Sequence, residues 1–109
     1  MDKQFQERLR LLKVDLLSFL HVLAVTDSIA LELNEISDST STSESDLKGV
    51  ISTLRRMKFN DESLIIPAGR DNDGRLRWKI NESIVRKNVL AKFLEEEILG
   101  KEGLKVNPK

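Results

Sequence analysis

Apolar residues follow helical spacing in four segments of this chain and strand spacing in one. The first helix is predicted over residues 3–25, because apolar side chains there recur at alternating steps of four and three. These positions are Phe5, Leu9, Leu12, Leu16, Phe19 and Leu23. Further apolar residues between them widen the stripe, so the helix must bury two sides. Either the second side packs against another subunit, or the helix is the central core helix of a monomer.

A shorter helix is predicted over residues 27–36, with Thr26 or Asp27 as its cap. Residues 37–45 follow, rich in hydroxyl groups and without an apolar side chain, and this composition predicts a loop. Either the helix continues beyond residue 36, or the turn is long and mobile. A solvated linker and a phosphorylated regulatory segment both fit residues 37–45.

A third helix is predicted over residues 44–59, and its apolar positions all fall on one face. They are Leu47, Val50, Ile51, Leu54 and Met57. Ser43, with Asp46 three residues later, resembles a capping box. Glu44 and Asp46 suit the positive end of the helix dipole, although their charge would repel DNA phosphates at that end.

A β-hairpin is predicted over residues 63–80. Its first strand covers residues 63–66 and ends at Pro67, and residues 71–74 form the tight turn. The second strand alternates apolar and basic residues, which is typical of a strand with one buried face. The alternating residues are Leu76, Trp78 and Ile80 on one face and Arg75, Arg77 and Lys79 on the other. We interpret Trp78 as an aromatic core residue rather than a stacking platform for bases.

The last helix is predicted over residues 82–99, with Asn81 as its cap, and residues 100–109 form a polar tail. The predicted fold is therefore mainly α with a small β-hairpin, an α+β single domain over residues 1–109. Apolar residues make up 39% and charged residues 33% of the chain, which excludes a disordered or membrane-embedded class. The beginning of the chain lacks the features of a signal peptide, so a cytoplasmic location and no membrane partner are expected.

The net charge of zero hides an uneven distribution. Residues 1–46 carry four basic and nine acidic side chains, a net charge of minus five. Residues 47–92 carry eleven basic and five acidic side chains, a net charge of plus six. The basic part coincides with the third helix and the hairpin, and a local basic patch decides binding to polyanions more than the total does.

Residues that could carry chemistry are sparse. The chain has no cysteine and no tyrosine, and its single histidine, His21, lies among apolar neighbours as expected for a core or interface residue. Residues 71–74 resemble the start of a calcium loop, but the later ligands are missing. The run at residues 95–97 is interpreted as a solvated acidic face. We expect no enzyme activity, no cofactor and no metal site.

The segments LKGVISTLRRMKF and SLIIPAGRDNDGRLRWKI, a helix followed by a basic hairpin, resemble the winged helix-turn-helix superfamily. Its small MarR-like and ArsR-like regulators are the most similar members, and the element order extends the resemblance to residues 3–99. In this superfamily the third helix enters the major groove, the wing contacts the DNA backbone or minor groove, and terminal helices form a dimer. The residues implied by position are Lys48, Ser52, Thr53 and Arg56 for the groove, and Arg70, Arg75 and Arg77 for the wing.

The resemblance implies a homodimeric transcriptional regulator that binds double-stranded DNA and pairs through its N- and C-terminal helices. The alternative is a winged-helix module that assembles with a protein partner and does not bind DNA. The acidic first half of the chain favours this alternative. The arginines of the hairpin also have two interpretations, as phosphate contacts or as the solvated face of an ordinary amphipathic strand.

Overall fold

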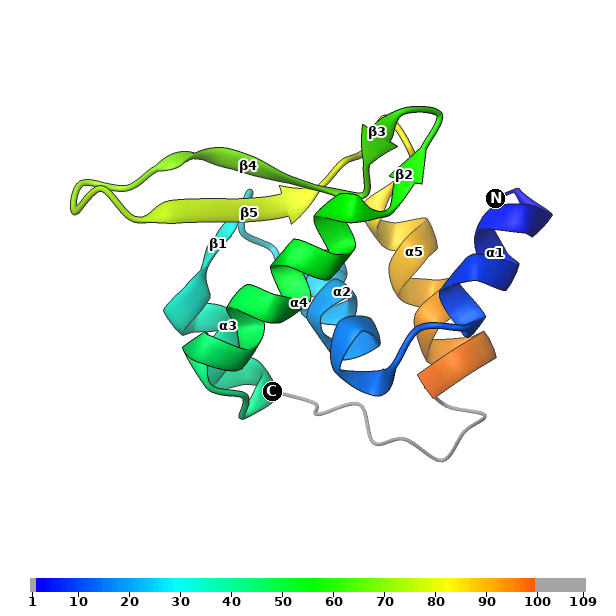
Figure 1. Cartoon of the computed structure of the whole chain (residues 1–109), viewed down its shortest axis with the longest axis horizontal. Coiled ribbons are helices and arrows are strands. Elements are labelled where there is room, and N and C mark those ends of the chain that lie inside the picture. Colours follow the sequence, from blue (N-terminus) through cyan, green and yellow to red (C-terminus); the bar gives the residue numbers. More distant parts are fainter. Residues whose placement is uncertain (1, 100–109) are drawn as a thin grey trace.

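The computed structural model describes residues 2–99 and has an α+β fold, as predicted (Figure 1). Its helices are α1 (Lys3–Arg10), α2 (Val14–Val25), α3 (Leu33–Thr40), α4 (Glu44–Arg56) and α5 (Lys87–Phe93), which a π-helical segment, η1 (Leu94–Leu99), continues. Its strands are β1 (Leu31–Glu32), β2 (Lys58–Phe59), β3 (Glu62–Ser63), β4 (Ile65–Arg70) and β5 (Leu76–Ile80). The polar tail predicted at residues 100–109 lies outside the described residues.

The main sheet has three antiparallel strands in the order β1-β5-β4. Leu31 and Pro67 both face Trp78 across the central strand, so the short strand β1 and the hairpin form one surface. Figure 1 shows the β4–β5 hairpin projecting past the helices on the side away from α1. Strands β2 and β3 form a separate small hairpin directly after α4.

The core surrounds α2, which packs against α3, α4, α5 and the sheet. Seven of its twelve residues are buried, and Phe19 and Leu20 are fully inaccessible. The predicted face of α4 is confirmed, because Leu47, Val50, Ile51 and Leu54 are buried and Met57 is half-buried. Trp78 is also buried under the sheet, which confirms its interpretation as a core residue.

The single helix predicted over residues 3–25 is two helices, separated at residues 11–13. The break lets α1 fold back against the β2–β3 hairpin. There Phe5 packs edge-on against Phe59 with 4.6 Å between ring centroids, and Arg8 donates to the carbonyl of Lys58 at 2.7 Å. Of the further apolar residues in this segment, Leu17 and Leu20 are buried within the chain, whereas Leu11 is 85% and Val14 is 48% exposed. Pairing of this segment with another subunit stays a prediction.

The helix predicted over residues 27–36 is shifted toward the C-terminus. Residues 31–32 pair with β5, and α3 begins after Glu32, which forms a capping box with Glu35. The helix then continues to Thr40, and Ser41 adopts a left-handed conformation at its end. Of the two possibilities for residues 37–45, the longer helix is confirmed, and α3 and α4 are joined by a short turn at residues 41–43.

Other predicted boundaries also differ. Helix α4 ends at Arg56 instead of residue 59 because residues 58–59 pair with β3, and Asn60 and Asp61 form the turn with positive φ. The first hairpin strand is residues 65–70, not 63–66. Pro67 lies inside it, which is tolerated because β4 is an edge strand.

The last helix begins at Lys87 instead of residue 82, so Asn81 is not its cap. Asn81 is buried and instead joins the end of β5 to β3. Its side-chain amide donates to the Ser63 carbonyl at 3.0 Å, and its Oδ1 accepts from the Ser83 hydroxyl at 2.7 Å. Residues 82–85 form a turn and a bend before α5, and Arg86 is its cap.

The cap at the start of α4 provides a stability prediction. The Ser43 hydroxyl accepts from the Asp46 backbone N–H at 3.1 Å, so Ser43→Ala is expected to lower the unfolding free energy by about 1 kcal/mol. Urea denaturation would measure the loss. Ser45→Ala, in the exposed first turn of the same helix, is the matched control and should change stability little. Equal effects of the two substitutions would contradict the assigned cap.

Candidate nucleic-acid interface

An open groove of about 740 Å³ lies between α4 and the hairpin. Its lining residues are Lys48, Ile51, Ser52, Arg55, Arg56, Lys58, Leu76 and Trp78. Four of them are basic and none is acidic. We call this surface the basic groove.

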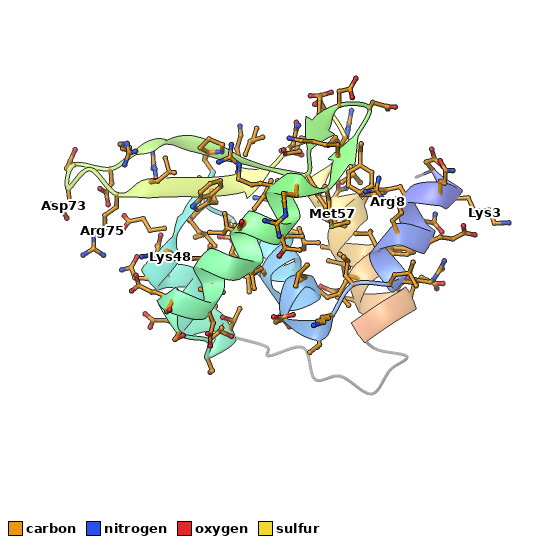
Figure 2. All side chains as sticks on the ribbon, in the orientation of Figure 1. Lys3, Arg8, Lys48, Met57, Asp73 and Arg75 are labelled. Atoms are coloured by element: carbon orange, nitrogen blue, oxygen red, sulfur yellow. The ribbon has the colours of Figure 1, made fainter. Side chains whose placement is uncertain are left out.

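The helical repeat explains why α4 presents these side chains together. Residues three and four apart lie on the same side of a helix, which aligns Lys48, Ser52, Arg55 and Arg56 beside the sheet. Leu47 and Leu54 on the opposite face of α4 are buried in the core, so the helix cannot rotate about its axis. Figure 2 places Lys48 on the part of α4 that lies below the hairpin.

Three of the four cations of the basic groove, Arg55, Arg56 and Lys58, contact neutral partners within the chain. Arg56 donates to the Ser52 hydroxyl at 3.0 Å, and Lys58 donates to the Ser63 hydroxyl at 2.8 Å. The guanidinium of Arg55 lies 5.5 Å from the centroid of the Trp78 ring, within the range of a cation–π contact. Because these partners carry no charge, the groove keeps a positive potential that an anion could use.

The three arginines of the hairpin occupy different environments. Arg75 is exposed at the tip and extends toward the helical side of the sheet (Figure 2). Arg70 donates to the Gly74 carbonyl at 2.7 Å and so closes the turn. Arg77 lies on the sheet face opposite Trp78 and is half-buried, and its Nε is buried without a hydrogen-bond partner among residues 2–99.

Asp71 stabilises the turn at the hairpin tip. Its Oδ1 accepts from the backbone N–H groups of Asp73 at 2.9 Å and Arg75 at 2.8 Å, and Gly74 supplies the positive φ of 80°. The carboxyl groups of Asp71 and Glu32 also interact, and Glu32 is the residue that caps α3. The hairpin tip therefore lies near the start of α3.

The carboxyl groups of Glu32 and Asp71 shift each other's pKa in opposite directions. The hydrogen bond to Asp71, followed by partial desolvation and the nearby negative charge, raises the pKa of Glu32 above its usual value. The hydrogen bond from Glu32, followed by that from the Arg75 backbone, lowers the pKa of Asp71. The hydrogen bond between the Glu32 and Asp71 carboxyl groups is lost when pH rises through the raised pKa of Glu32. It is also lost when pH falls through the lowered pKa of Asp71.

The predicted site residues are only partly brought together. Lys48, Ser52 and Arg56 line the basic groove, whereas Thr53 lies on the other flank of α4 and donates to the Gly49 carbonyl at 3.1 Å. The acidic Asp46 also lies on that other flank. Arg55 and Lys58 were missed as site residues. Their signal was present in the sequence, because both lie outside the apolar face of the predicted helix.

No protein-family model, curated protein or solved structure matches this chain. Within residues 2–99, no helix combines the length and apolar character needed to cross a membrane.

The Glu32–Asp71 contact can be tested by titration. Asp71→Asn keeps the oxygen that accepts from Asp73 and Arg75 but removes the negative charge, so the pKa of Glu32 should fall toward its usual value. Carboxyl-carbon NMR across a pH series measures this shift. Asp73→Asn is the matched control at the exposed tip and should leave Glu32 nearly unchanged. If Glu32 titrates at the same pH in wild type and Asp71→Asn, the contact does not form in solution.

Proposed function

We propose that this chain is a winged helix-turn-helix protein that binds duplex DNA, as a homodimeric transcriptional regulator. The element order supports this proposal, since β1 stands between α2 and α3, and the β4–β5 hairpin follows α4. The strand order β1-β5-β4 supports it further, because the hairpin stands beside the helix that would enter the major groove.

The observation that carries the proposal is the charge of the basic groove. Lys48, Arg55, Arg56 and Lys58 form a positive surface on one side of α4, and Arg75 extends from the hairpin tip toward the same side of the sheet. Lysine and arginine contacts to phosphates supply most of the sequence-independent affinity of DNA-binding proteins. Ser52 and Arg56 add hydrogen-bonding groups that can read base edges.

A duplex fits this surface better than a single strand does. Proteins that bind single strands stack bases on exposed aromatic rings. In the basic groove the aromatic residue is Trp78, which is only 6% exposed and lies beneath Arg55. The groove therefore offers charge and hydrogen bonds but little area for stacking.

The second candidate is a module that assembles with another protein. Glu44 and Asp46 favour it, because both are exposed at the start of α4, where a helix that enters the major groove approaches the bases. A carboxylate there repels phosphate and can accept only from a donor such as the cytosine amino group. A stable protein complex together with an absence of salt-dependent DNA binding would select this candidate.

The DNA-binding proposal predicts a specific salt dependence. A fluorescent random-sequence duplex is titrated with wild type and with Arg55→Gln/Arg56→Gln at a series of salt concentrations, and anisotropy reports binding. Wild-type affinity should fall steeply with salt, and the double variant should bind more weakly. Its log–log slope should be smaller by ~0.9 for each phosphate that the variant no longer neutralises.

The matched control is Arg86→Gln/Lys92→Gln, which removes the same charge from exposed positions at the start of α5 and within it. It should retain the wild-type slope, whereas Arg75→Gln at the hairpin tip should reduce it. Equal reductions in affinity for the control and the groove variant would indicate nonspecific attraction by net charge. No binding at the lowest salt concentration would refute the proposal.

A further inference from the structure

A cavity of about 220 Å³ lies between α1, the β2–β3 hairpin and the loop that precedes α5. Two acids, Asp2 and Glu62, and two cations, Arg8 and Lys58, line it together with the rings of Phe5 and Phe59. Its volume is below the range of about 300–1,000 Å³ that is usual for drug-sized ligands, so a ligand of this cavity is small. We call it the α1 cavity.

The ring of Phe59 has a charge of each sign beside it. The guanidinium of Arg8 lies over this ring, 4.0 Å from its centroid. Glu62 lies opposite Phe59 in the β2–β3 ladder, so both side chains leave the same face of the hairpin, where directly opposed Cβ atoms are about 5 Å apart. The cation and the carboxylate are therefore neighbours of one ring, at a spacing that a small molecule can bridge.

Neutral groups hold each of these two charges in place. Arg8 donates to the Lys58 carbonyl at 2.7 Å. Glu62 Oε1 accepts from the Ser83 hydroxyl at 3.0 Å and from the side-chain amide of the buried Asn81 at 3.3 Å. No ion pair within residues 2–99 involves Arg8 or Glu62. Both charges are thus positioned, yet neither is neutralised by the other.

This arrangement selects the charge of the ligand. A simple anion beside Arg8 would also face the acids Glu62 and Asp2. A simple cation beside Glu62 would also face Arg8 and Lys58. A molecule that carries one charge of each sign balances both pairs and gains charge-assisted hydrogen bonds at each end. The Phe59 ring adds an apolar surface between the two charges.

We propose that the α1 cavity binds a free α-amino acid with a short apolar side chain. The carboxylate of the ligand pairs with Arg8, its ammonium group pairs with Glu62, and its side chain packs on the ring of Phe59. This site is distinct from the basic groove, with which it shares only Lys58 among the lining residues. A small-molecule ligand is thereby added to the proposed DNA partner.

An NMR titration of the full chain without DNA tests this site. The three probes are L-valine, N-acetyl-L-valine, which lacks the ammonium group, and L-valinamide, which lacks the carboxylate. L-valine should shift the backbone amide resonances of Asn60 and Ser83, which line the cavity. Each of the other two compounds should bind about tenfold more weakly or worse, because it leaves one positioned charge without a partner.

A substitution at Glu62 identifies the partner of the ammonium group. Glu62→Gln keeps an oxygen that accepts from Ser83 and Asn81 but removes the charge, so its affinity for L-valine should fall about tenfold. Its affinity for N-acetyl-L-valine should not fall, since that compound has no ammonium group to lose. Glu7→Gln is the matched control, because Glu7 is exposed on α1 and lies outside the lining.

A substitution at Arg8 tests the other end of the ligand. Arg8→Gln should weaken binding of L-valine but not of L-valinamide. Lys3→Gln is the matched control, because Lys3 is exposed and points away from the hairpin on the far side of α1 (Figure 2). The dispersion of the amide spectrum verifies that each variant is folded, and the three-probe comparison on wild type needs no variant.

Three results would overturn the inference. The first is an absence of shifts with L-valine up to its solubility limit. The second is a modified compound that binds wild type as tightly as L-valine does, which would indicate a site for a single charge. The third is a folded Glu62→Gln variant that binds L-valine like wild type. Because DNA is absent from these titrations, their outcome is independent of the proposed DNA binding.

Discussion

The pairing of β1 with β5 is the contact on which the arrangement of the candidate site depends. Leu31 lies opposite Trp78 on the central strand, and α3 begins immediately after β1. The pairing therefore fixes where the α3–α4 unit begins relative to the hairpin. Trp78 is buried between them, and Arg55 of α4 lies over its ring. The indole lines the basic groove together with the basic side chains of α4.

The same constraint gives the hairpin two different surfaces. On the face toward the helices, Trp78 and Ile80 are buried, whereas Arg77 and Lys79 on the other face are half-buried. Only the tip projects beyond the helices, and there the Asp71 carboxylate accepts from the backbone N–H of Arg75. The position of Arg75 is thus determined by hydrogen bonds within the turn itself.

The sequence predicted the elements in which the spacing of apolar residues matches the face that is buried in the structure. The apolar face of α4 and the alternation in β5 are examples. Lys48, Ser52 and Arg56 were implied by the resemblance to the winged-helix superfamily, and these three line the basic groove. The break at residues 11–13 was not predictable from spacing, because no glycine or proline marks it and the contact of Phe5 with Phe59 is distant in sequence. Strand β1 was missed for a similar reason. Two residues are too few to show an alternation of apolar and polar positions, and their extended conformation depends on pairing with β5.

Helix α4 divides the surface of the protein into two chemically different flanks. On one flank, basic residues interact with hydroxyl groups and an indole ring, so their charge stays available to an outside anion. On the other flank, Asp46 and Gly49 border a hollow with an apolar lining, which suits a protein surface better than a phosphate. Asp46, whose charge in the sequence argues against DNA binding, therefore faces away from the basic groove.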